Sequence, residues 1–155
     1  MRSCQDIQHI KKAGFTLVEL LVVMVVLAIL ATVGIPNFGP TVANSRVTSA
    51  ANDLLGALQL ARSEAVRLNE PVLITPTGGN WADGWAITRA GTTIRQRDAL
   101  ARVTIAGGPA NVEFGSAGNA NTTASFTIEA NGGGNPQRCL TVVASGSAVV
   151  TPGGC

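Results

Sequence analysis

KKAGFTLVELLVVMVVLAILATVGIP, residues 11–36, begins with a basic pair and continues as an almost unbroken apolar segment. Twelve consecutive apolar residues run from Leu20 to Ala31. Residues 15–36 would form about 33 Å of α-helix at ~1.5 Å per residue, close to the roughly 30 Å thickness of the hydrocarbon core of a bilayer. The stretch therefore predicts a transmembrane helix at residues 15–36.

Basic residues precede this apolar segment. Arg2, Lys11 and Lys12 all lie within residues 1–14, which we call the leader. Positive charge beside a membrane helix favours the cytoplasmic side. We therefore expect a single pass with a cytoplasmic N-terminus and with the remainder of the chain on the far side of the membrane.

Glu19 is the one charged side chain inside the apolar segment. An acid within a spanning helix costs roughly 1–3 kcal/mol, less near a helix end, and indicates a function by default. The alternative is that Glu19 lies at the membrane interface and reaches water. The sequence leaves both explanations open.

Composition after the leader excludes several classes of site. Both lysines and the single histidine, His9, lie in the leader, while the remaining chain has eight arginines and eight carboxylates and therefore no net side-chain charge. A Ser-His-Asp or Cys-His nucleophile needs a histidine base, the usual zinc sites use imidazole, and a Schiff base needs lysine. We expect neither an enzyme nor a metal or cofactor site.

Residues 37–70 are predicted to form an amphipathic helix. Gly34 and Pro36 indicate a break before it, because both residues weaken the helical backbone. Apolar residues then recur at alternating spacings of four and three, which places them on one face. These residues are Val47, Ala51, Leu54, Leu58, Ala61, Ala65 and Leu68. We expect this face to pack against a sheet, and the helix to end before Pro71.

Residues 71–155 consist of short β-prone runs separated by Gly, Asn and Pro. Alternation of polar and apolar residues, as in Ser125–Glu129, favours an antiparallel sheet with one face on the helix and one in water. The predicted strands are Val72–Thr75, Trp85–Arg89, Thr93–Leu100, Arg102–Ile105, Asn111–Gly115, Ser125–Ala130, Cys139–Ala144 and Ala148–Thr151. The fold class is therefore α+β: a long N-terminal helix, half apolar and half amphipathic, packed on an antiparallel β domain.

The start of the chain resembles the signal of type IV pilins and type II secretion pseudopilins. The resemblance rests on a basic leader, Gly14, Phe15, and Glu19 at the fifth place after the glycine. It implies cleavage between Gly14 and Phe15 by a prepilin peptidase and N-methylation of Phe15. It also implies that Glu19 assists subunit assembly by pairing with the N-terminal amine of a neighbouring subunit, which makes a buried carboxylate far less costly.

The β region resembles the FimT/FimU-type minor pilins and the GspH pseudopilins. The matching features are Asp83-Gly84-Trp85, the strand Val112-Glu113-Phe114-Gly115 with its Gly/Asn-rich loop, and the closing hairpin at residues 138–150. This resemblance implies a pilin-like fold and a minor pilin that primes assembly or lies near the filament tip and supports twitching motility. Alternatives are a type II secretion pseudopilin and a DNA-uptake receptor.

The resemblance also implies partners and a location. The partners are other minor and major pilins, the prepilin peptidase and the assembly platform of the bacterial inner membrane. The chain is expected first in that membrane, with its C-terminal domain in the periplasm, and then in the pilus fibre.

Three cysteines are present, and the resemblance implies that Cys4 is lost with the leader. Cys139 and Cys155 then remain as an even pair in an exported domain, where disulfides are permitted. A bridge between them would stabilise the fold by about 3 kcal/mol on the loop-entropy model. Two free thiols are the alternative.

A nucleic-acid site has weak support. Some FimT-type proteins bind DNA and carry Gly-Arg-x-Arg near the C-terminus, where this chain has Gly146-Ser147-Ala148-Val149. Arg95 and Arg97 alternate onto one face of a predicted strand and are the remaining candidates; a solvated face or a subunit contact is the alternative. Trp81 and Trp85 could stack on bases or could anchor a loop to the core.

Overall fold

The computed structural model describes residues 14–33, 39–131 and 136–155. The chain divides into two compact units, Met1–Phe38 and Gly39–Cys155, and each is described by itself. The predicted helix break at Gly34 and Pro36 lies outside the described residues.

The first unit contains the helix α1, Leu17–Val33. It is apolar on every side, so no single face is selected for packing. Its large apolar side chains are half to four-fifths exposed within the chain. Among the described residues, no helix meets both the length and the apolarity needed to cross a membrane.

The second unit is organised around the helix α2, Gly39–Leu68. Six of the seven residues predicted for the apolar face are buried, and Ala50 joins them, whereas Leu68 at the end of the helix is only partly buried. The buried residues are Val47, Ala50, Ala51, Leu54, Leu58, Ala61 and Ala65. The helix ends at Leu68, and Asn69 follows with a positive φ of 53°. Asn tolerates this left-handed conformation, which commonly terminates helices.

In the described residues after α2 there are eight strands, and all eight overlap the predicted ones. They are β1 (Val72–Pro76), β2 (Trp85–Arg89), β3 (Thr92–Arg97), β4 (Val103–Gly107), β5 (Val112–Phe114), β6 (Ala124–Ala130), β7 (Gln137–Val142) and β8 (Ala148–Pro152). They form two four-stranded sheets, in the orders β3-β2-β1-β5 and β4-β6-β7-β8. Every described strand pair is antiparallel.

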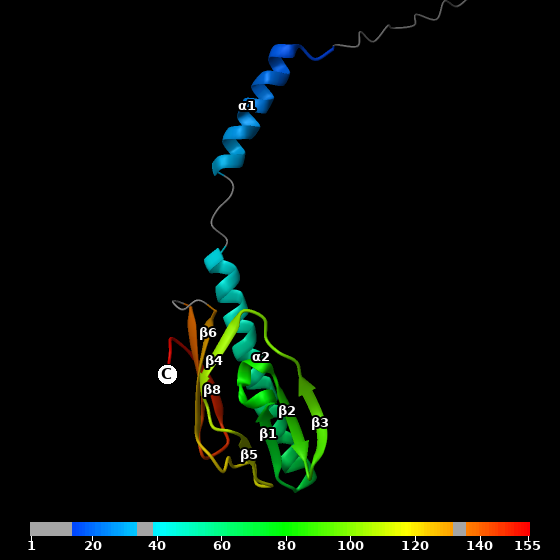
Figure 1. The fold of residues 1–155 in the computed structure, drawn as a ribbon, viewed down its shortest axis with the longest axis vertical. Coiled ribbons are helices and arrows are strands. Elements are labelled where there is room, and N and C mark those ends of the chain that lie inside the picture. Colours follow the sequence, from blue (N-terminus) through cyan, green and yellow to red (C-terminus); the bar gives the residue numbers. More distant parts are fainter. Residues whose placement is uncertain (1–13, 34–38, 132–135) are drawn as a thin grey trace, which may run out of the picture. The chain divides into compact units, whose positions relative to one another are not determined.

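The core of the second unit lies between α2 and the two sheets (Figure 1). The helix contacts β1 and β5 of one sheet and β4, β6, β7 and β8 of the other. Fully buried Phe114 and Phe126 come from opposite sheets. The predicted α+β architecture, a helix packed on antiparallel strands, is confirmed; the division of the strands into two sheets is a feature that the sequence did not specify.

Two tryptophans belong to this core. Trp81 belongs to a short 3-10 turn, Trp81–Asp83, and Trp85 begins β2. Each is only 3% exposed. The Trp81 ring meets Phe126 edge-on, with ring centroids 5.0 Å apart, and its Nε1 donates to the Pro109 carbonyl at 3.0 Å. Both tryptophans therefore anchor the core rather than present flat faces for bases.

Candidate assembly site

The first turn of α1 holds the residues that the leader motif singles out. Thr16 immediately precedes the helix, and its Oγ1 accepts a hydrogen bond from the Glu19 backbone N–H at 3.2 Å. The Thr16 carbonyl accepts from the Leu20 N–H at 3.2 Å. This is an N-cap, in which a threonine side chain satisfies one of the unpaired N–H groups of the first turn. Phe15 and Glu19 are therefore held on either side of a defined helix start.

The Glu19 carboxylate is exposed at this helix start. Within the part of the chain that the structure describes, it has no hydrogen-bond or ion-pair partner. The position suits a negative charge, because the first turn of a helix carries a partial positive charge. The carboxylate is thus stabilised locally but remains available to a cation from another molecule.

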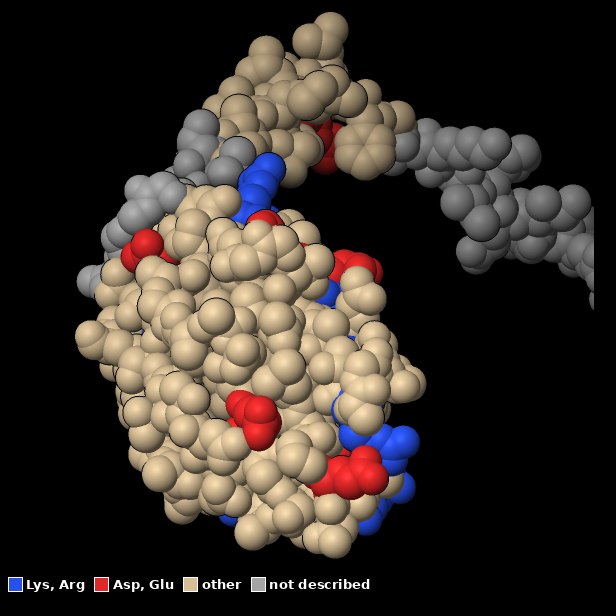
Figure 2. Space-filling model, turned by 60° about the horizontal axis from the view of Figure 1, so that its bottom comes forward, with Lys and Arg blue, Asp and Glu red and all other residues tan. Residues whose placement is uncertain are grey.

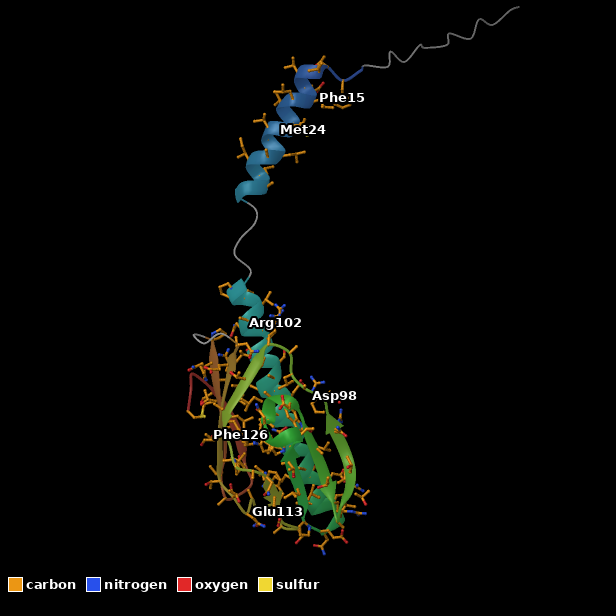
Figure 3. The ribbon with its side chains drawn as sticks, in the orientation of Figure 1. Phe15, Met24, Asp98, Arg102, Glu113 and Phe126 are labelled. Atoms are coloured by element: carbon orange, nitrogen blue, oxygen red, sulfur yellow. A yellow bond between two sulfur atoms is a disulfide. The ribbon has the colours of Figure 1, made fainter. Side chains whose placement is uncertain are left out.

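Phe15 and the helix α1 that follows it expose a large apolar surface. Phe15 is 81% exposed and Met24 is 63% exposed. Both side chains project away from the helix axis, in company with Leu and Val on the other sides (Figure 3). A continuous apolar surface of this kind indicates a membrane or protein contact rather than a surface left in water.

Arg95 and Arg97 occupy the outermost strand of one sheet. Ile87 pairs with Arg95 and Trp85 pairs with Arg97, so the two arginines continue the inner face of the sheet beyond its apolar part. Arg97 Nη2 lies 2.7 Å from Asp53 Oδ2 of α2. The structure therefore brings the two arginines together, as expected, but places a carboxylate beside one of them.

Charges elsewhere on this unit are scattered or paired. Figure 2 shows a face with few charged side chains, and at one edge acidic and basic groups lie side by side. Glu64 accepts hydrogen bonds from Arg67 and thereby raises the pKa of that guanidinium. Ion pairs of Arg67, Arg89 and Arg97 with carboxylates reduce the positive charge that is available to a phosphate backbone.

The stretch at residues 146–149 has a structural role. Gly146 has φ 78°, and a Cβ there would lie 1.9 Å from the Gly118 carbonyl oxygen. Arg62 of α2 binds the two loops that contain Gly118 and Gly146. Its Nε donates to the Gly118 carbonyl oxygen at 2.8 Å, and its Nη2 donates to the Ser145 carbonyl oxygen at 3.1 Å. Ser147 and Val149, which stand where the DNA-binding pattern has arginines, are exposed.

The C-terminus is fixed by a disulfide between Cys139 and Cys155, with Cα atoms 4.9 Å apart. The Cys155 N–H also donates to Thr127 Oγ1 at 3.1 Å. The bond links the last residue to β7. Across the described residues, no group of three or more histidine, cysteine or carboxylate side chains comes together as a metal site.

Three residues make structural hydrogen bonds that the sequence analysis did not predict: Thr16, Arg62 and Arg138. Thr16 could have been found, because Thr-x-x-Glu before an apolar run is the signature of a capping box. Arg62 and Arg138 could not. Arg138 Nη2 donates to Asn44 Oδ1 at 3.0 Å and to Thr48 Oγ1 at 3.3 Å. Such contacts join residues about ninety positions apart, and nothing local in the sequence indicates them.

Comparison with protein families gives two matches. Residues 50–147 match the family described as type II transport protein GspH. Residues 10–35 match the prokaryotic N-terminal methylation motif. Among curated proteins, no sequence matches this chain.

Solved structures of a minor pilin and a minor pseudopilin have a fold similar to that of this chain. The type IV minor pilin FimU of Pseudomonas aeruginosa is 26% identical, with a TM-score of 0.62 over 70% of this chain and 90% of that one. The minor pseudopilin EpsH of the Vibrio cholerae type II secretion system is 11% identical, with a TM-score of 0.56 over 69% of this chain and 97% of that one. The second likeness concerns the fold alone.

Proposed function

The chain belongs to the GspH family of minor pilins and pseudopilins, and on that premise we propose that it is a minor subunit of a type IV pilus. In this role it primes assembly or lies near the tip, and it supports twitching motility. The observation that carries the proposal is the conjunction of the methylation motif at residues 10–35 with a β unit similar to that of a type IV minor pilin.

Maturation would take place at the start of α1. A prepilin peptidase would cut between Gly14 and Phe15 and methylate the new Phe15 amine. Support comes from the motif match and from the Thr16 cap, which fixes the helix start one residue after that amine. Glu19 would then bind the Phe15 amine of a neighbouring subunit, so that two charges enter an apolar filament core as a pair rather than singly.

Residues 15–36 would hold the subunit in the bacterial inner membrane as a single pass before assembly. The N-terminus would face the cytoplasm and the β unit the periplasm, in keeping with the basic leader. The partners would be other minor and major pilins and the membrane assembly platform. The chain would act as a structural subunit, not as an enzyme.

The test is a Glu19→Ala substitution in the native host. We expect the mutant to be cleaved and methylated at Phe15 but to fall roughly tenfold or more in sheared pili, the change that about 1.4 kcal/mol produces. Glu70→Ala, an exposed carboxylate of the second unit, serves as the matched control and should be incorporated normally. Normal incorporation of Glu19→Ala would contradict the assembly role of that carboxylate.

A second candidate is a minor pseudopilin of a type II secretion system. The observations that favour it are the GspH family match and the shared fold with EpsH. Deletion of the gene distinguishes the two functions: loss of twitching indicates a pilus, and loss of protein secretion indicates the secretion system. Mass analysis of the mature protein tests both, because a chain that still begins at Met1 would be an ordinary anchored domain instead.

A further inference from the structure

A groove lies between α2 and the strand β3. Its volume is about 360 Å³, and it is lined on one side by the α2 residues Asn52, Asp53, Gly56, Ala57 and Leu60 and on the other by Trp85, Ile87, Arg95 and Arg97. The groove exists because the inner face of the sheet continues past the helix: its row of side chains is apolar on β5, β1 and β2 and becomes arginine on β3. Its volume is at the small end of the range for binding pockets.

Gly56 in the wall of this groove is unexplained by the fold of the chain itself. It lies mid-helix and exposed, and a Cβ built on it would meet no atom within 4 Å. Glycine in a helix interior is less favourable than alanine by about 1 kcal/mol, so the unit would be more stable with a side chain there. The missing side chain leaves room for another molecule to approach the helix closely at this point.

The groove carries one excess positive charge. Arg97 is paired with Asp53, whereas the guanidinium of Arg95 has no hydrogen-bond or ion-pair partner among residues 14–33, 39–131 and 136–155. Both arginines are exposed on β3. The charge left over favours an occupant that brings a carboxylate to Arg95.

The strand β3 has a free edge. It ends the order β3-β2-β1-β5, and all six of its residues are exposed (Figure 1). Charged residues on an edge strand protect it against indiscriminate pairing. The same charges would select a partner strand of opposite charge, since specificity combines repulsion of wrong partners with attraction of the right one.

We propose that β3 and this groove bind an extended, acidic segment of a neighbouring subunit, which adds a fifth strand to the sheet. Main-chain hydrogen bonds to the free edge would provide affinity, and alternate side chains would provide specificity. Residues directly opposite on adjacent strands have Cβ atoms about 5 Å apart, so one carboxylate faces Arg95 on the groove side of the sheet. A long side chain on the same face of the added strand would extend across β3 towards Gly56. The inference rests on the proposed function, because it names a contact within the assembled filament or secretion complex.

The experiment uses the full chain in its native host with a photo-crosslinking amino acid at Gln96 of β3. The matched control places the same group at Ala106, which is exposed on β4, an edge strand of the other sheet. We expect Gln96 to crosslink to one subunit, and mass spectrometry to map the contact to a segment with an acidic residue in an alternating pattern. Arg95→Glu should reduce this crosslink roughly tenfold, and replacing the mapped acid by arginine in the partner should restore it.

Two further variants test the close approach at Gly56. Gly56→Leu should reduce the Gln96 crosslink, whereas Ser63→Leu, an exposed position of α2 outside the groove, should leave it unchanged. The melting temperature of both variants, followed by fluorescence of the buried Trp81 and Trp85, should be at least that of the wild type. A melting temperature that is not lowered would show that the crosslink is reduced because the contact is blocked and not because the unit is misfolded.

The proposal would be overturned by a crosslink that maps to a helix, by the absence of any Gln96 crosslink in assembled complexes, or by indifference to Arg95→Glu. In each of these outcomes the chain is still trimmed at Phe15 and incorporated, so the proposed function stands. Failure of incorporation of the wild-type chain would instead contradict the proposed function itself.

Discussion

The two helices of this chain differ in whether their apolar side chains are buried. The large apolar residues of α1 are exposed within the chain, whereas α2 buries seven residues along one face between two sheets. Burial of apolar area stabilises a fold by roughly 25 cal/mol per Å². Burial of the α2 face therefore stabilises the second unit, whereas the exposed apolar surface of α1 is of the kind that a membrane or protein contact covers.

The largest expected effect on the free energy of unfolding comes from replacing a leucine of α2, and a leucine of α1 serves for comparison. Leu58→Ala in α2 should lower the free energy of unfolding of the second unit by about 3 kcal/mol, because it leaves a cavity at a fully buried site. Leu27→Ala in α1 should leave that value unchanged. Urea denaturation of the full chain in detergent micelles measures both, with tryptophan fluorescence as the readout, since both tryptophans belong to the second unit. A similar loss for the two variants would show that α1 contributes to the second unit after all.

A smaller effect is expected from the polar anchor of α2. Arg138→Met keeps much of the aliphatic volume but removes the hydrogen bonds to Asn44 and Thr48, and should cost about 1 kcal/mol. Arg102→Met is the matched control: the side chain of this exposed arginine has no partner in the described part of the chain, and its replacement should change stability by less than about 0.5 kcal/mol. The same urea titration measures the stability of both variants. Equal losses for Arg138→Met and Arg102→Met would contradict the anchoring role of Arg138.

The cap of α1 should affect only its own helix. Thr16→Ala removes the acceptor for the Glu19 N–H and should weaken the first turn by about 1 kcal/mol, whereas Thr16→Ser should retain it. Amide hydrogen exchange of the Glu19 N–H in detergent micelles should accelerate in the alanine variant only. The unfolding curve of the second unit should be identical in all three chains, and a shift in that curve would contradict the independence of the units.

The smallest effect is expected for the ion pair between Arg97 and Asp53, which lines the groove. Arg97 and Asp53 are each about half exposed, so Arg97→Gln should cost no more than about 0.5 kcal/mol. A double-mutant cycle with Asp53→Asn should give a coupling that declines further in 1 M salt. A coupling well above about 1 kcal/mol would mean that the pair holds β3 against α2 and belongs to the core rather than to an open surface.

Local patterns in the sequence predicted much of this protein. The residue spacing of 47–68 predicts the buried face of α2, and alternation with turn residues predicts all eight strands. The basic leader, Gly14, Phe15 and Glu19 predicted the pilin or pseudopilin class. These predictions succeed because helix and strand periods, and the chemistry of a processing motif, are carried by residues within a few positions of one another.

Only the tertiary structure decided the arrangement of these parts. The split into two sheets around α2, the extension of β3 beyond the helix, and the anchors from Arg62 and Arg138 all depend on residues far apart in the chain. Strand order follows from the sum of many weak long-range contacts, to which no single stretch of sequence contributes a readable signal. The sequence alone determined what each segment is, whereas the packing of α2 determined which surfaces remain open for other subunits.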